Sequence, residues 1–165
     1  MEIRKATPAD VEAWLALRSA LWPDTTEERH RTEIAETLAR PVAAAAFLAG
    51  EAGAPPVGFV EVSLRRWAEG CESSPVGYLE GWYVDPNARG QRIGGALVGA
   101  AEAWARERGC TEMASDTELG NAVSHAAHGW LGYEVVAKLV CFRKRLDRVP
   151  QPAMARDLVG DCRES

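Results

Sequence analysis

The stretch RGQRIGGAL, residues 89–97, constrains the fold of this chain more than any other segment. It lies between a run of large apolar residues, YLEGWYV, and an Ala-rich pattern with helical spacing, so a strand must pass into a helix there. Gly94 and Gly95 occupy the start of that helix, although glycine costs a helix roughly 0.5–1 kcal/mol relative to Ala. We expect exposed backbone N–H groups at this helix N-terminus, which suit a phosphate. The alternative is that the glycines only allow a neighbouring element to pack closely.

The rest of the pattern predicts alternating strands and helices without an internal repeat. Strands are expected at 2–5, 42–50, 57–66, 78–84 and 111–115, and helices at 8–21, 27–40, 91–108 and 121–131. The segment YEVVAKLVCFRKRL, residues 133–146, is expected to add one or two further strands. This order predicts one α/β (α+β) domain over residues 1–146, followed by a loose polar tail at 147–165.

Composition excludes several classes of function. The chain has 165 residues, enough for one domain with a sizeable core, and a formal net charge of −5. That charge argues against a nucleic-acid partner and suits a small cationic substrate. No apolar run is long enough for a membrane span, and the N-terminus lacks the apolar region of a signal peptide. Four cysteines without CxxC or metal-ligand spacing indicate reduced thiols in a cytoplasmic protein.

A resemblance to a known family rests on three motifs in order. Gln91-x-x-Gly94-x-Ala96 resembles the Q/R-x-x-G-x-G/A pyrophosphate loop of the GCN5-related N-acetyltransferases, the GNAT superfamily. The strand and turn YVDPNARG precede it, and a Gly-aromatic pair in HGWLGYE follows the next helix. The resemblance implies a mixed, mostly antiparallel sheet that is flanked by helices and splayed at a bulged strand. Gly81, in mid-strand, is the expected bulge.

The same resemblance implies acetyl-CoA as cosubstrate. Its pyrophosphate would bind the backbone of the loop, and its pantetheine arm would pair with the bulged strand. The implied cofactor-binding residues are Trp82, Tyr83, Val84, Arg89, Gly90, Gln91, Arg92, Ile93, Gly94, Gly95 and Asn121. For Asn121 the alternative is a plain helix N-cap.

Further segments resemble one subgroup of that superfamily, the aminoglycoside 6'-N-acetyltransferases. They are LW at 21–22, CESSPVGYLEG at 71–81, EMASDTELGN at 112–121 and FRKRL at 142–146. The resemblance implies acetyl transfer to the 6'-amine of a cationic aminoglycoside and a homodimer that shares C-terminal strands. Ala137 is a departure, because the resembling enzymes can carry a further acidic substrate contact near that position.

The chemistry of amine acetylation requires carboxylates near the acceptor. An alkylamine has a pKa near ~10.4, so only about 1 in 10³ to 10⁴ is neutral at pH 7, and the site must attract an ammonium yet remove its proton. Asp116, after a strand end, and Glu80, within an apolar strand, are the candidate catalytic and substrate-binding carboxylates. The alternatives are a turn or cap residue for Asp116 and a solvated or ion-paired strand residue for Glu80.

Three further side chains are candidates for the site. His128 lies four residues before Gly132, where many family members place a Tyr, and is the candidate acid for the CoA thiolate or else a structural histidine. Trp22 and Trp67 lie in loops expected to border the acceptor, where aromatic faces bind sugars and ammonium groups, and packing is their alternative role. His125 and His128 lack an evident third ligand, so no metal is expected.

Two other functions compete with this prediction. One is acetylation of another small polyamine or of a peptide amine, although the acidic and Trp-bearing loops favour a small polycation. The other is a non-catalytic CoA-binding regulatory module, which keeps the RGQRIGG loop but does not need Glu80 or Asp116.

Overall fold

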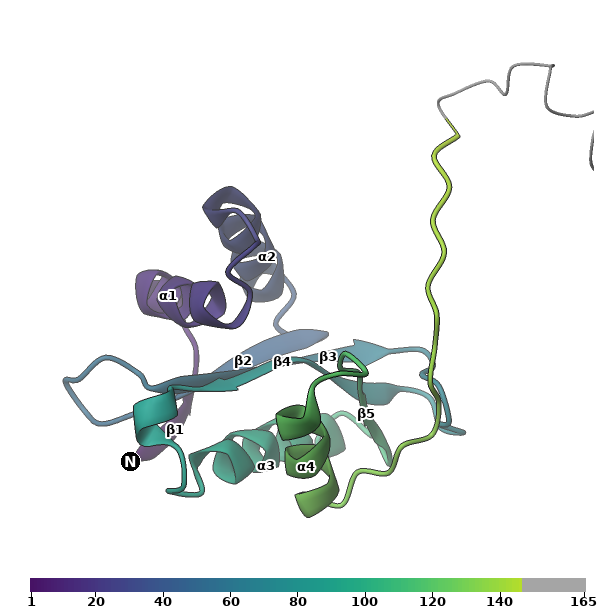
Figure 1. Cartoon of the computed structure of the whole chain (residues 1–165). Coiled ribbons are helices and arrows are strands. Elements are labelled where there is room, and N and C mark those ends of the chain that lie inside the picture. Colours follow the sequence, from purple (N-terminus) through teal and green to yellow (C-terminus); the bar gives the residue numbers. More distant parts are fainter. Residues whose placement is uncertain (147–165) are drawn as a thin grey trace, which may run out of the picture.

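Five strands form one sheet in the order in which they occur in the sequence (Figure 1). They are β1 (Glu2–Lys5), β2 (Ala44–Gly50), β3 (Gly58–Arg65), β4 (Val76–Val84) and β5 (Met113–Ser115). The first four pair antiparallel, and β5 adds parallel to β4. This computed structural model describes residues 1–146 of the chain. The predicted tail at 147–165 lies outside the described residues.

Helices cover both faces of the sheet (Figure 1). On one face lie α1 (Val11–Leu21), which follows the 3-10 turn η1 (Pro8–Asp10), and α2 (Glu27–Ala39). On the other lie α3 (Ile93–Arg106), which follows the 3-10 turn η2 (Pro86–Ala88), and α4 (Ala122–Trp130). The five strands and four helices that the sequence pattern predicted in residues 1–132 are therefore present, and the α/β fold class is confirmed.

Each face of the sheet has its own apolar core, as the alternation of strand side chains requires. Val60, Val62 and Leu79 face α3 and pack with its buried stripe, which includes Leu97 and Ala101. Toward α1 and α2, Leu48 and Phe59 pack with Trp14, Leu17 and Ile34. The helix starts are fixed locally, since Thr26 accepts a hydrogen bond from the Arg29 N–H and Asn121 accepts one from the Ser124 N–H.

The predicted bulge in β4 is confirmed, and its extra residue is Glu80. Glu61 of β3 pairs with Gly81, whereas the next residue, Val62, pairs with Leu79. On the other edge of β4, pairing with β5 covers only Gly77–Leu79. Beyond the bulge, Trp82–Val84 therefore have no partner in β5, and the sheet opens between these two strands.

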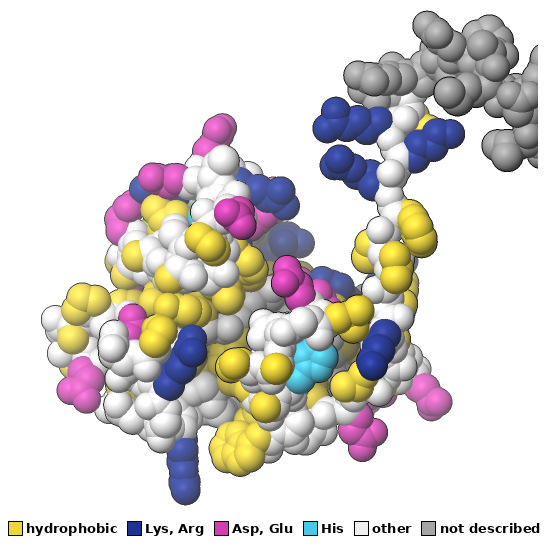
Figure 2. All heavy atoms as spheres, in the orientation of Figure 1, with side chains coloured by type: hydrophobic (Ala, Val, Ile, Leu, Met, Phe, Trp, Pro, Cys, Tyr) yellow, Lys and Arg dark blue, Asp and Glu magenta, His cyan; other side chains and the backbone are white. Residues whose placement is uncertain are grey.

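The strands expected within residues 133–146 are not formed in the single chain, and that prediction is corrected here. This segment runs away from the body past β5 (Figure 1). Its apolar side chains are exposed, with Val135 at 71%, Val140 at 74% and Phe142 at 93%. A strand needs a hydrogen-bonding neighbour, and none is present for this segment within residues 1–146. Figure 2 shows hydrophobic side chains along the part nearer the body and basic ones farther out.

Candidate active site

The start of α3 presents a row of backbone donors without acceptors. Arg89 N–H bonds back to Pro86, and Ala96 N–H begins the helix by donating to the Arg92 carbonyl at 3.1 Å. Between them, the N–H groups of residues 90–95 have no acceptor within the described part of the chain. Gly90 and Arg92 adopt left-handed backbone conformations, with φ of 80° and 61°. For an arginine this conformation is strained, and it turns the donors outward at the positive end of the helix dipole.

The glycines at this helix start also serve packing, so the two roles proposed for them are compatible. A Cβ added to Gly94 would lie 2.8 Å from Cζ2 of Trp82, and one added to Gly95 would lie 3.2 Å from Cζ3 of Trp130. Gly94 thus lets β4 approach the helix start closely. The same approach brings the unpaired segment of β4 beside the row of donors.

His128, on α4, lies beside the opening between β4 and β5. Its ring packs edge-on against Trp82 and Tyr133, with centroid separations of 5.6 and 5.4 Å. Nδ1 is 2.8 Å from the Ser124 carbonyl, which can only accept, so Nδ1 carries a proton. Nε2 is 3.0 Å from Oγ of Ser115. The neutral ring accepts a hydrogen bond there, and a protonated ring would donate one toward the end of β5.

Five polar side chains are joined on the sheet face that carries α1 and α2. Glu80 accepts hydrogen bonds from Ser63 Oγ at 2.5 Å and from Arg65 Nε and Nη2 at 3.1 and 2.7 Å. The Arg65 guanidinium lies 3.3 Å from the centroid of the Tyr78 ring. Tyr78 in turn donates its phenol to Oδ1 of Asp116 at 2.5 Å. The pKa of Tyr78 is raised, mainly by burial and to a smaller extent by this bond to Asp116.

Glu80 is therefore a partly exposed carboxylate, although it lies within an apolar strand. Its side chain is 34% exposed and forms an ion pair with Arg65. The bulge explains the difference, because the extra residue in β4 turns Glu80 toward Ser63 and Arg65 at the end of β3. The ion-paired alternative for this residue holds in the structure.

The buried carboxylate of this region is Glu61 on β3, which the sequence analysis did not single out. Its Oε1 accepts from Nε1 of Trp14 at 2.7 Å and from Nη1 of Arg18 at 2.5 Å. Arg18 also bonds His30 and Glu33, and both Arg18 and Glu61 are almost fully buried. Burial raises the pKa of Glu61 despite the Arg18 charge, which is shared with Glu33. The sequence does carry a signal for this buried carboxylate, because Glu61 interrupts the apolar strand GFVEVSL.

Comparison with known proteins gives the family. Residues 13–133 match the model of the acetyltransferase (GNAT) family. The chain belongs to the GNAT acetyltransferase family. This acetyltransferase is 50% identical over 146 residues to an aminoglycoside N(6')-acetyltransferase type 1 of Klebsiella aerogenes, covering 87% of this chain and 96% of the relative. It is 47% identical to one of Stenotrophomonas maltophilia, covering 88% of this chain and 94% of the relative.

Solved structures agree with these relatives. An AAC(6')-Iy enzyme in complex with the bisubstrate analogue CoA-S-monomethyl-acetylneamine superposes with a TM-score of 0.82 at 35% identity, covering 87% of this chain and 97% of that one. The apo AAC(6')-IG enzyme from Acinetobacter haemolyticus gives a TM-score of 0.83 at 39% identity, covering 89% and 100%. Both resemblances stated from the sequence motifs are confirmed.

The two tryptophans of the acetyltransferase differ in their surroundings. Trp22 is partly buried and packs on Phe59 and Arg18, and its ring fills the space over Gly81 where a Cβ would collide with it. Trp67 is 66% exposed in the loop after β3. Trp22 therefore combines its packing role with contact to the bulge, while Trp67 has the exposure that ligand contact needs.

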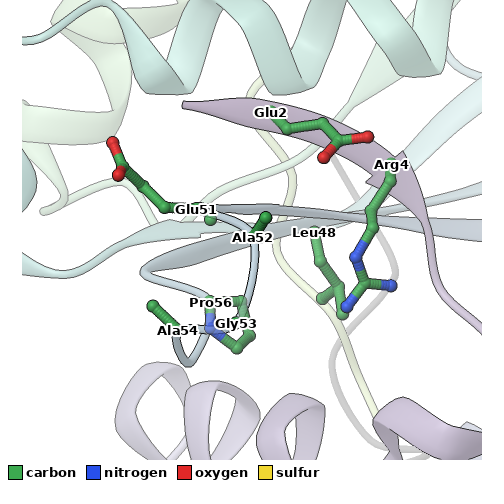
Figure 3. Close-up of a pocket in the computed structure, with 9 residues that line it drawn as sticks. Glu2, Arg4, Leu48, Glu51, Ala52, Gly53, Ala54 and Pro56 are labelled. Carbon is green, nitrogen blue, oxygen red and sulfur yellow. The ribbon is translucent and has the colours of Figure 1, made fainter.

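Two hollows of the surface differ in their relation to this site. A cavity of about 360 Å³ lies between the end of α2 and the sheet, with Thr37, Arg40, Glu61, Arg65 and Glu80 in its lining. A smaller one of about 80 Å³ lies at the β2–β3 turn, and its lining includes Glu2 and Arg4 of β1 and Gly53 and Pro56 of the turn (Figure 3). Arg4 is already paired with Asp10 at 2.6 Å, so its charge is neutralised locally.

Among residues 1–146 there is no group of three or more His, Cys, Asp or Glu side chains that could hold a metal ion. In the same range no helix has the length and apolar character needed to cross a bilayer.

Proposed function

We propose that this acetyltransferase transfers the acetyl group of acetyl-CoA to the 6'-amino group of aminoglycosides and thereby confers resistance to them. The observation that carries the proposal is the joined cluster of Ser63, Arg65, Tyr78, Glu80 and Asp116 beside the bulge. It brings two exposed carboxylates to one face, and Asp116, which has no cationic partner within residues 1–146, attracts a polycationic acceptor there. The relatives named above are aminoglycoside 6'-N-acetyltransferases at up to 50% identity, which supports the same acceptor class.

The acetyl-CoA site is proposed at the opening of the sheet and the start of α3. Acetyl-CoA supplies an activated thioester. The unpaired donors at residues 90–95 suit its pyrophosphate, and the unpaired edge of β4 suits its pantetheine amides. The residues proposed to hold it are Trp82, Tyr83, Val84, Arg89, Gly90, Gln91, Arg92, Ile93, Gly94, Gly95 and Asn121.

Asp116, Glu80 and His128 are the proposed catalytic residues. Asp116 is exposed, and its second oxygen has no partner within residues 1–146, so it is the better candidate to accept the proton of the attacking ammonium. Glu80 would orient the amine electrostatically. His128 would deliver a proton to the leaving thiolate from Nε2, the nitrogen that faces Ser115. Trp22 and Trp67 are the proposed aromatic contacts of the acceptor.

We further propose a homodimer in the cytoplasm. The exposed apolar side chains of residues 133–146 support a partner chain that covers them, and the free thiols of Cys71, Cys110 and Cys141 fit a reducing compartment. Sedimentation of the full chain tests the dimer, and a variant ending after Tyr133 is expected to sediment as a monomer.

An acceptor screen tests the function. Thiol release from acetyl-CoA should be fast with aminoglycosides that carry a 6'-amine and at least ~100-fold slower with matched compounds that carry a 6'-hydroxyl. Polyamines and peptides with a free N-terminus serve as competing acceptors. Preferred turnover of either class, or acetylation at another amine of the drug by NMR, would contradict the proposal.

A further inference from the structure

Arg65 occupies a place where a carboxylate and an aromatic ring both face a cation. Its guanidinium bonds both oxygens of Glu80 and lies flat over the ring of Tyr78. A carboxylate and an aromatic face together are what a protein offers to an organic ammonium group. The enzyme without acceptor thus fills this cation subsite with one of its own side chains.

This pairing removes much of the attraction that Glu80 could exert on an incoming ligand. The Arg65–Glu80 pair has no net charge, and Ser63 takes a further lone pair of the same carboxylate. Asp116 retains its charge, because its partner Tyr78 is a neutral phenol. An acceptor ammonium therefore meets one available carboxylate and one that must first release Arg65.

Release of Arg65 is feasible in this structure. Its side chain is 41% exposed, and it belongs to the last residue of β3. Exposed ion pairs contribute little to stability because water replaces both partners readily. The adjoining cavity of about 360 Å³, lined in part by Arg65 and Glu80, leaves room for either side chain to reorient.

We propose that Arg65 is a specificity-determining residue that competes with the acceptor for Glu80 and the Tyr78 ring, and that acceptor binding displaces it. This rests on the function proposed above. This competition raises the dissociation constant of an acceptor in proportion to how far its binding depends on Glu80. A polycation also binds Asp116 and other contacts while Arg65 still holds Glu80, so it loses less affinity than an acceptor with a single amine. Arg65 would thereby select for polycationic acceptors.

Calorimetric titration with neamine and with a 6-amino-6-deoxyhexose, which has one amine, tests the proposal on Arg65→Gln. We expect the Kd of the monoamine to fall about two- to fivefold, the range of an exposed ion pair, and that of neamine to fall by a smaller factor. Arg66→Gln is the matched control. It removes the same charge one residue away, and Arg66 makes no hydrogen bond or ion pair within residues 1–146. Acetyl-CoA affinity should not change in either variant.

The results separate this proposal from the one it rests on. Unchanged or weaker monoamine binding in Arg65→Gln, a gain for neamine at least as large as that for the monoamine, or an equal gain in Arg66→Gln, would overturn the role of Arg65. Arg65→Lys keeps the charge but loses the two-pronged bond to Glu80 and the stacking on the Tyr78 ring. We therefore expect a smaller gain in acceptor affinity than in Arg65→Gln, and a loss of affinity would count against the proposal. Failure of the wild-type enzyme to bind or acetylate neamine would instead contradict the proposed function.

Discussion

Two arginine–glutamate pairs lie on the same face of β3, and they differ in their access to water. In the pair of Arg18 with Glu61 the side chains are 4% and 7% exposed, whereas in the pair of Arg65 with Glu80 they are 41% and 34% exposed. Glu61 and Arg65 are only four residues apart in the strand. The same two residue types therefore form a structural pair at one end of β3 and an exchangeable one at the other.

The comparison shows how burial decides what a charge can do. Arg18 is enclosed by Glu61, Glu33, His30 and the Trp22 ring, and its own side chain is only 4% exposed, so a ligand has little access to its guanidinium. Arg65 and Glu80 face a cavity, and their separation exposes each to water at little cost. The buried network also supports Trp22, whose ring lies over Gly81, so it steadies the bulge from which Glu80 projects.

The largest expected effect is on stability. Arg18→Met leaves Glu61 buried without its cation, and we expect the free energy of unfolding to fall by about 3–5 kcal/mol. Arg65→Met, the same change at the exposed pair, should cost less than about 1 kcal/mol. Urea unfolding followed by circular dichroism measures both. Equal losses in the two variants would remove the distinction between the pairs.

Most of the framework could be predicted from the sequence, because it depends on local patterns. The glycine stretch at 89–97, the cap at Asn121 and the bulge beside Gly81 are each encoded within a few residues. The prediction of strands within 133–146 was wrong for the single chain. The apolar pattern shows that the segment favours strand conformation, but it does not show whether a neighbouring strand is present to pair with it.

The partners within the site depend on register, which the sequence pattern did not determine. Both Glu61 and Glu80 interrupt an apolar strand, yet only Glu61 is buried, because the bulge shifts the pairing between them. The link from Tyr78 to Asp116 joins residues 38 positions apart. Asp116 and Glu80 could thus be identified as candidates from the sequence, whereas Arg65, Tyr78 and Ser63, which connect them, could not.

The second prediction concerns catalysis by the exposed cluster. Asp116→Asn removes the proposed base, and we expect kcat/KM for aminoglycosides to fall by roughly 10²-fold or more, with acetyl-CoA affinity unchanged. Glu80→Gln should lower it less, because its charge is already balanced by Arg65. Rates of thiol release, measured across a range of pH, test both variants. In the variant that lacks the base, the acidic limb of the pH profile of kcat/KM should be lost or shifted.

Glu72→Gln is the matched control for these carboxylates. Glu72 lies in the loop before β4, and its side chain has no hydrogen bond or ion pair among residues 1–146. The substitution therefore removes the same charge without changing a contact of the cluster around Glu80 and Asp116. Near-wild-type rates and pH profiles in both Asp116→Asn and Glu80→Gln would show that these carboxylates are structural. Loss in Glu80→Gln alone would move the role of base to Glu80.

The smallest expected effect is a pH dependence of stability that comes from the buried pair. Burial raises the pKa of Glu61 above its ordinary value of 4.5, so between these two values the folded state binds more protons at this site than the unfolded state. The contribution of Glu61 to stability is therefore complete below about pH 4.5 and is lost as the pH rises through the raised pKa. Wild-type stability relative to Glu61→Gln should decline with rising pH across this window. Urea unfolding at half-unit steps from pH 4 to 8 measures the differences. A Glu61→Gln difference that is flat, or that grows with pH, would mean that Arg18 outweighs burial and that the interior pair is tighter than its desolvation allows.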